Sequence, residues 1–215
     1  MDAKFWHDRW ARNEIGFHEG TPNASLVRHF DRLGLAPGAR VFVPLCGKSH
    51  DLSWLASRDM KVVGAELSRA AVDQFFDEAG IAPTSEKAGR LSRVTAGPIS
   101  IFAGDIFDLD AETLGTVDAV YDRAALIALP PDMRPRYAAH LAANTNAAPQ
   151  LLVTLEFAEG DTAGPPFSVT AADVHRYYAD RFHTRELERT TPNPARRDGR
   201  TATTVVWHLT GNSPK

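Results

Sequence analysis

The chain has 215 residues, of which 43% are hydrophobic and 24% are charged, and its net charge is −3. This length and composition are typical of one soluble globular domain with enough interior to fold without disulfides or metals. The slightly negative charge argues against a nucleic-acid-binding protein, whose binding face is usually basic. We therefore expect no nucleic-acid partner, and we expect a monomer.

The cysteine and histidine content points to neither disulfides nor metals. The single cysteine, Cys46, excludes an internal disulfide, and the eight histidines show no metal-ligand spacing. The N-terminus does not resemble a signal peptide, and no apolar run approaches the roughly 20 residues that span a membrane. We therefore predict a cytoplasmic protein with no membrane partner and no metal site.

The N-terminal part of the chain is predicted to be helical. Residues 4–13 have a helical pattern with Trp6 and Trp10 near one face, and Pro22 begins a second apolar helix. The two tryptophans are either core residues or the aromatic wall of a lid over a ligand. We assign residues 1–36 to an N-terminal helical lid.

From residue 40 onward, predicted strands alternate with predicted helices. The strands are expected at 40–44, 61–67, 99–103, 117–121, 150–157, 182–188 and 203–209. The helices are expected at 49–58, 69–79, 132–144 and 171–179. Residues 80–98 lack periodicity and are predicted to be an irregular surface excursion. The alternation predicts an α/β fold with a mostly parallel, doubly wound sheet, and the last two strands form a β-hairpin. We predict one domain, 1–215, with a Rossmann-like core at 40–210.

Ligands of such a sheet lie outside the carboxyl ends of the strands. Four successive strand ends here carry Leu45-Cys46-Gly47, Glu66, Asp105 and Asp122-Arg123. Glu66 suits the vicinal hydroxyls of a ribose, or it caps the following helix. Asp105 suits an adenine amino group, or it forms an Asx-turn. Arg123 pairs either with a ligand carboxylate or with Asp122.

The run Gly47-Lys48-Ser49 is similar to the end of a phosphate-binding loop. The motif G-x-x-x-x-G-K-[ST] requires a glycine at position 42, where this chain has Phe42. A nucleotide-binding protein that uses these three residues is therefore the less favoured alternative, from a different functional class.

Ordered motifs along the chain resemble the thiopurine S-methyltransferase family, which includes bacterial members linked to tellurite and selenium methylation. The motifs, found from about residue 4 to about residue 180, are Phe5-Trp6-His7-x-x-Trp10, Ile15-Gly16-Phe17-His18, Val43-Pro44-Leu45-Cys46-Gly47-Lys48-Ser49, Val63-Gly64-Ala65-Glu66-Leu67-Ser68, Gly104-Asp105-Ile106-Phe107-Asp108-Leu109, Tyr121-Asp122-Arg123-Ala124-Ala125-Leu126 and Gly164-Pro165-Pro166-Phe167. The resemblance implies the class I methyltransferase fold, with S-adenosylmethionine as methyl donor.

The resemblance also implies roles for individual residues. It places six residues on the cofactor: Trp10, Leu45, Glu66, Arg123, Asp105 and Ile106. Of these, Asp105 and Ile106 lie near the adenine. It places Phe17 against the ring of the methyl acceptor, and Arg123 is also a candidate for orienting that acceptor. Residues 19–25 and 190–200 match the family poorly, so a second substrate arginine, for which Arg196 and Arg197 are candidates, is not assigned.

The expected function is methyl transfer from S-adenosylmethionine to sulfur, or to selenium or tellurium, in a small acceptor such as an aromatic or heterocyclic thiol. A thiol of low pKa attacks as an anion, so no dedicated general base is expected. One alternative is a methyltransferase of the same fold that acts on a halide, an oxygen nucleophile or a metabolite thiol.

Overall fold

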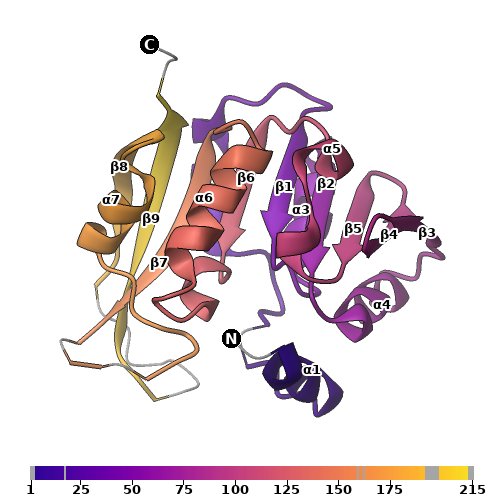
Figure 1. Cartoon of the computed structure of the whole chain (residues 1–215), viewed down its shortest axis with the longest axis horizontal. Coiled ribbons are helices and arrows are strands. Elements are labelled where there is room, and N and C mark those ends of the chain that lie inside the picture. The colour runs from indigo at the N-terminus through magenta and orange to yellow at the C-terminus, as the bar shows by residue number, and fades with distance from the viewer. Residues whose placement is uncertain (1–2, 17, 159, 162, 192–198, 213–215) are drawn as a thin grey trace.

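The computed structural model describes residues 3–16, 18–158, 160–161, 163–191 and 199–212 (Figure 1). Within these residues, nine strands form one mixed sheet in the order β3-β4-β5-β2-β1-β6-β7-β9-β8. The strands are β1 Arg40–Pro44, β2 Lys61–Glu66, β3 Thr84–Ala88, β4 Leu91–Ala96, β5 Ile99–Ala103, β6 Ala119–Arg123, β7 Gln150–Phe157, β8 Phe182–Arg189 and β9 Ala202–Gly211. Strands β5, β2, β1, β6 and β7 run parallel, and the outer strands on each side are antiparallel.

Helices cover both faces of this sheet. They are α1 Ala3–Ala11, α2 Ala24–His29, α3 His50–Ser57, α4 Arg69–Glu78, α5 Ala111–Leu114, α6 Arg134–Asn144 and α7 Ala171–Tyr178, with 3-10 turns η1 Phe30–Leu33, η2 Ile106–Asp108 and η3 Leu126–Ala128. In Figure 1, α6 and α7 lie in front of the sheet. The described helices are too short, or too polar, to cross a bilayer.

The central strands are buried on both sides, which explains their nearly continuous apolar sequence. In β1, Phe42 packs in the cluster that contains the inner faces of α5, α6 and α7. Its neighbours Val41 and Val43 point the other way and pack with α2, α3 and α4. The alternation of side chains across β1 thus connects two hydrophobic cores and fixes the sheet between its helical layers.

The predicted doubly wound sheet and its closing hairpin, β8–β9, are confirmed. The prediction of an irregular segment at 80–98 is wrong, because most of these residues form the antiparallel hairpin β3–β4, which extends the β5 edge. Strand β3 is exposed over nearly all its length at the sheet edge. An edge strand exposed in this way needs no alternation of apolar residues, so the sequence carried no periodic signal for it.

Candidate functional site

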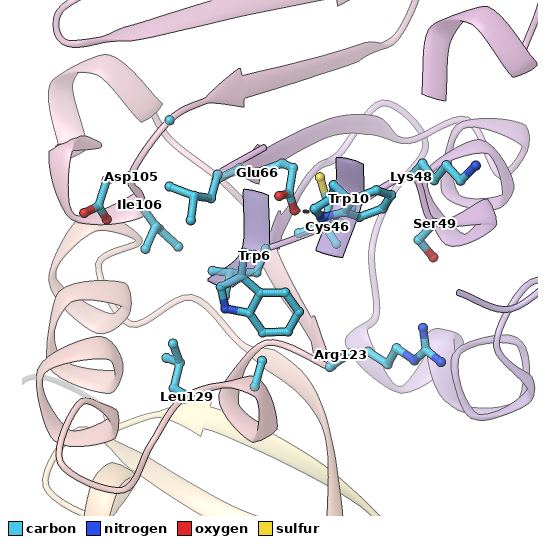
Figure 2. A pocket seen from close by; sticks show the side chains of 18 of the residues that line it. Trp6, Trp10, Cys46, Lys48, Ser49, Glu66, Asp105, Ile106, Arg123 and Leu129 are labelled. Carbon is cyan, nitrogen blue, oxygen red and sulfur yellow. Dashed lines mark hydrogen bonds between the residues drawn. The ribbon is translucent and has the colours of Figure 1, made fainter. Parts of the chain in front are cut away.

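The described residues form a pocket at the carboxyl ends of β1, β2, β5 and β6, and α1 contributes to its wall. All six positions that the sequence pointed to as a cofactor site line this pocket: Trp10, Leu45, Glu66, Asp105, Ile106 and Arg123. In Figure 2, Asp105 and Ile106 lie at one end, Lys48 and Arg123 lie toward the other, and Glu66 and the two tryptophans lie between them. The pocket is therefore elongated, with chemically different ends.

The backbone turns sharply where three of these strands end. Leu45 follows β1 with φ +47°, Gly104 follows β5 with φ +138°, and Ala124 follows β6 with φ +65°. Left-handed backbone is unfavourable for leucine and alanine, and such strained residues often occur at functional sites. All three residues line the pocket, so two strained residues and one glycine form the turns at these strand ends.

Glu66 connects the loop after β1 to the helix after β2. Its Oε2 accepts a hydrogen bond from the Gly47 N–H (2.9 Å), and its Oε1 accepts one from the Ser68 N–H (2.8 Å). Ser68 is the residue before α4, so Glu66 does help to cap this helix. Burial raises the pKa of the Glu66 carboxyl, and the amide donors of Ser68 and Gly47 oppose that shift. Each carboxylate oxygen retains a second lone pair for a ligand hydroxyl.

Trp10 covers the loop that Glu66 holds. Its side chain is buried, and a Cβ atom built on Gly47 would lie 3.2 Å from the indole ring. Gly47 also has φ +55°, so both the conformation and the contact favour glycine at this position. Trp6 extends into the middle of the pocket beside it (Figure 2). The predicted aromatic face of α1 is therefore part of the pocket wall.

The phosphate-binding alternative is not supported by the contacts of its three residues. The Gly47 amide donates to a carboxylate, which would repel a phosphate. The Lys48 ammonium pairs with Glu78 at 2.5 Å, and the Ser49 hydroxyl caps α3 by accepting from the Asp51 N–H at 3.1 Å.

Asp105 begins the short turn η2 at the other end of the pocket. Its Oδ1 accepts a hydrogen bond from the Phe107 N–H at 2.9 Å, so the Asx-turn considered from the sequence is present. The neighbouring side chain of Ile106 is buried and adds an apolar surface beside it. A carboxylate next to an apolar surface suits a planar ring with amino groups.

Asp122 and Arg123 do not pair with each other, so the pairing considered from the sequence is wrong. Both lie within β6, where successive side chains point to opposite faces. Asp122 is fully buried and accepts hydrogen bonds from the Leu126 N–H (3.2 Å) and the Tyr137 hydroxyl (2.8 Å). Arg123 instead forms an ion pair with Glu19 in the segment between α1 and α2.

A pH-dependent stability follows from Asp122, because burial raises the pKa of its carboxyl to about 6. The folded state then holds a proton that the unfolded chain releases near pH 4, so this contribution to stability falls as pH rises from about 4 to about 6. We expect wild type to gain up to ~1.4 kcal/mol per pH unit over Asp122→Asn on acidification in this range. Urea unfolding of both proteins at pH 7, 6 and 5 measures the difference, and a constant difference would contradict the raised pKa.

Several pocket residues were not predicted from the sequence. His18, Tyr121, Leu129 and Met133 line the pocket. His18 and Tyr121 stand in the family motifs but were given no role, and no local pattern distinguishes Leu129 and Met133. Phe17, Arg196 and Arg197, which were considered for the acceptor, lie outside the described residues.

Cys46 also lies in the pocket wall, and its side chain is buried. Burial, and secondarily the charge of Glu66, raises the pKa of its thiol well above the ordinary value. The thiol is therefore protonated near neutral pH and is a poor nucleophile.

The parallel sheet closed by an antiparallel hairpin, with a carboxylate at the end of β2, defines a class I S-adenosylmethionine-dependent methyltransferase fold. Solved structures share this fold. The 1,6-didemethyltoxoflavin-N1-methyltransferase of Burkholderia thailandensis superposes with a TM-score of 0.66 at 13% identity, covering 98% of this chain and 87% of that one. The magnesium protoporphyrin IX methyltransferase of Synechocystis gives a TM-score of 0.64 at 17% identity, covering 97% and 100%.

Sequence comparison identifies the family. The model of the family described as Thiopurine S-methyltransferase (TPMT) matches residues 1–208. The thiopurine S-methyltransferase of Xanthobacter autotrophicus is 51% identical over 211 residues, which are 97% of this chain and 99% of that protein. The one of Pseudomonas aeruginosa is 48% identical over 190 residues, 88% and 87% of the two chains. The chain belongs to the thiopurine S-methyltransferase family and is an S-adenosylmethionine-dependent methyltransferase.

Proposed function

We propose that this enzyme methylates the sulfur of a small aromatic or heterocyclic thiol, and that the pocket at the strand ends holds both the cofactor and the acceptor. The observation that carries the proposal is the arrangement of Glu66 in the middle of one elongated pocket, with Arg123 toward one end and Asp105 at the other. The family, whose related members are named for thiopurine methylation, supports sulfur as the accepting atom.

The residues of the pocket fit the parts of S-adenosylmethionine in sequence. Glu66 would accept hydrogen bonds from the ribose hydroxyls through lone pairs that its two amide donors leave available. Asp105 and Ile106 would hold the adenine ring. Leu45, with its left-handed backbone, would shape the loop around the amino-acid end. No pyrophosphate has to be held there, so one glycine suffices in this loop.

When bound, the cofactor supplies an electrophilic methyl group, which forms a bond to the acceptor sulfur as its bond to the sulfonium sulfur breaks. The protein's task is then to hold the two sulfurs in line with the methyl carbon, which contributes roughly 7–11 kcal/mol at best. Trp6 and Trp10 would wall this volume off from water. We therefore propose that residues 1–36 act as a lid over the core.

The proposed reaction requires no dedicated general base in this pocket. An aromatic or heterocyclic thiol of low pKa loses its proton to water and attacks as an anion. The Arg123 guanidinium has five N–H donors, and those that Glu19 does not take would orient this anion at its end of the pocket.

A product analysis tests the proposal. The enzyme is incubated with S-adenosylmethionine and thiophenol, phenol or aniline, which differ only in the accepting atom, and a selenophenol arm tests the heavier chalcogen. We expect S-methylation of thiophenol at a rate at least about 100-fold above that of phenol or aniline, since thiophenol, unlike phenol, is largely ionised near neutral pH. Preferred methylation of phenol or aniline would contradict a sulfur-directed enzyme, as would turnover of halide ions with none of thiophenol.

A further inference from the structure

The ion pair between Arg123 and Glu19 occupies the acceptor end of the pocket. The Arg123 side chain is 17% exposed and that of Glu19 is 46% exposed. The arginine therefore lies in the pocket wall, whereas the glutamate reaches it from the water side. The guanidinium of Arg123, which could bind an anionic group of a ligand, thus already pairs with a carboxylate of the protein.

Glu19 is held in this position by a second contact. Its Oε2 accepts a hydrogen bond from Asn23 Nδ2 at 3.1 Å, while its Oε1 pairs with Arg123. The Asn23 side chain is itself oriented, because its Oδ1 caps α2 by accepting from the Ser25 N–H at 3.0 Å. Glu19 is therefore a preorganised carboxylate and not a freely moving surface side chain.

A buried carboxylate anchors the same network to the core. Asp51, only 2% exposed, accepts hydrogen bonds from the Asn23 N–H (2.7 Å) and from the Tyr121 hydroxyl (3.1 Å). The chain of contacts runs from the end of β6 through Asp51 and Asn23 to Glu19, and from Glu19 back to Arg123. This closed network of contacts holds the segment before α2 against the acceptor end of the pocket.

Few other charges at this end of the pocket are available to an anionic acceptor. The Lys48 ammonium pairs with Glu78. Burial, followed by the nearby charge of Lys48, lowers the pKa of His18, so its ring is neutral at pH 7. Arg123 is therefore the main cationic group there, and Glu19 neutralises it.

We propose that Glu19 is a specificity-determining residue that selects acceptors without a carboxylate and disfavours those that carry one. A carboxylate on the acceptor must displace Glu19 from Arg123 or lie beside its negative charge, and both cost free energy. An acceptor without a carboxylate leaves the pair intact. This inference rests on the proposed function, because it takes the Arg123 end of the pocket as the acceptor end.

The test compares Glu19→Gln with wild type on 4-mercaptobenzoate and 4-mercaptobenzamide, which have similar shapes and differ in charge. The variant removes the charge but keeps the side-chain length. In Glu19→Gln we expect kcat/KM for 4-mercaptobenzoate, divided by that for 4-mercaptobenzamide, to rise about tenfold over wild type. The change should come mainly from a lower KM for 4-mercaptobenzoate. Glu14→Gln is the matched control, because Glu14 lies in the same N-terminal segment, is 48% exposed and pairs with Arg12 away from the pocket.

A binding measurement separates this inference from the proposed function. Benzoate and benzamide are titrated by NMR into wild type and both variants, each saturated with S-adenosylhomocysteine, so no methyl transfer is needed. We expect tighter benzoate binding in Glu19→Gln only, and unchanged benzamide binding in both variants. If benzoate binding tightens but no thiol is methylated, the sulfur acceptor is wrong and the role of Glu19 stands. An unchanged benzoate-to-benzamide ratio, or an effect confined to cofactor affinity, would overturn the role of Glu19.

Discussion

Replacement of Glu66 by alanine is expected to weaken S-adenosylhomocysteine binding about ten- to a hundred-fold, or ~1–3 kcal/mol. The carboxylate is buried at the end of β2, where it accepts hydrogen bonds from the Gly47 and Ser68 amides. Alanine removes the acceptor for the ribose hydroxyls, and it also leaves two backbone donors of the cofactor loop without their partner. The first loss acts on the bound state directly, and the second allows the loop to leave the shape that holds the ligand.

Isothermal titration calorimetry of the two proteins measures this effect. Glu86→Ala is the matched control, since Glu86 is an exposed carboxylate on β3 that pairs with Arg93 away from the pocket. The control is expected to bind S-adenosylhomocysteine like wild type. Wild-type affinity in a Glu66→Ala protein whose circular dichroism spectrum is native would exclude Glu66 from the cofactor site.

Replacement of Arg123 by alanine is expected to lower kcat/KM for an aromatic thiol about ten- to a hundred-fold, the worth of a charge-assisted hydrogen bond at a partly buried site. Stability should change little, because the partner Glu19 is half exposed and such a pair contributes ~0–1 kcal/mol. Arg123→Lys keeps the charge but loses the bidentate geometry, so it should recover only part of the activity.

Steady-state kinetics and thermal unfolding of the same samples distinguish a functional arginine from a structural one. Arg12→Ala serves as the control, because Arg12 is an exposed arginine of the N-terminal segment that pairs with Asp8 and Glu14. A large fall in melting temperature with full activity per folded Arg123→Ala molecule would mean that the ion pair with Glu19 is structural.

The sheet and the strand ends could be predicted because burial on both faces leaves a direct mark on the sequence. Runs such as Val41-Phe42-Val43 predict a central strand, and the polar residue that follows a run marks its carboxyl end. Glu66 and Asp105 were found in this way. The edge hairpin β3–β4 was missed, because exposed residues such as those of β3 carry no such constraint.

The partners of the pocket residues could not be predicted from local patterns. Arg123 was expected to pair with its neighbour Asp122 or with a ligand, but the pleat of β6 separates the two side chains. Its partner, Glu19, is far away in sequence and reaches it only because Asn23 and Asp51 fix the intervening segment. Such contacts depend on how the N-terminal segment packs on the sheet, which local sequence periodicity does not encode.

A crystal structure of the protein with S-adenosylhomocysteine most directly tests the central claim that the pocket at the strand ends holds the cofactor. We predict both ribose hydroxyls within hydrogen-bonding distance of the Glu66 carboxylate, the adenine beside Asp105 and Ile106, and the ligand sulfur facing the Arg123 end of the pocket. A ligand bound elsewhere, or one that leaves Glu66 bonded only to the Gly47 and Ser68 amides, would contradict the account.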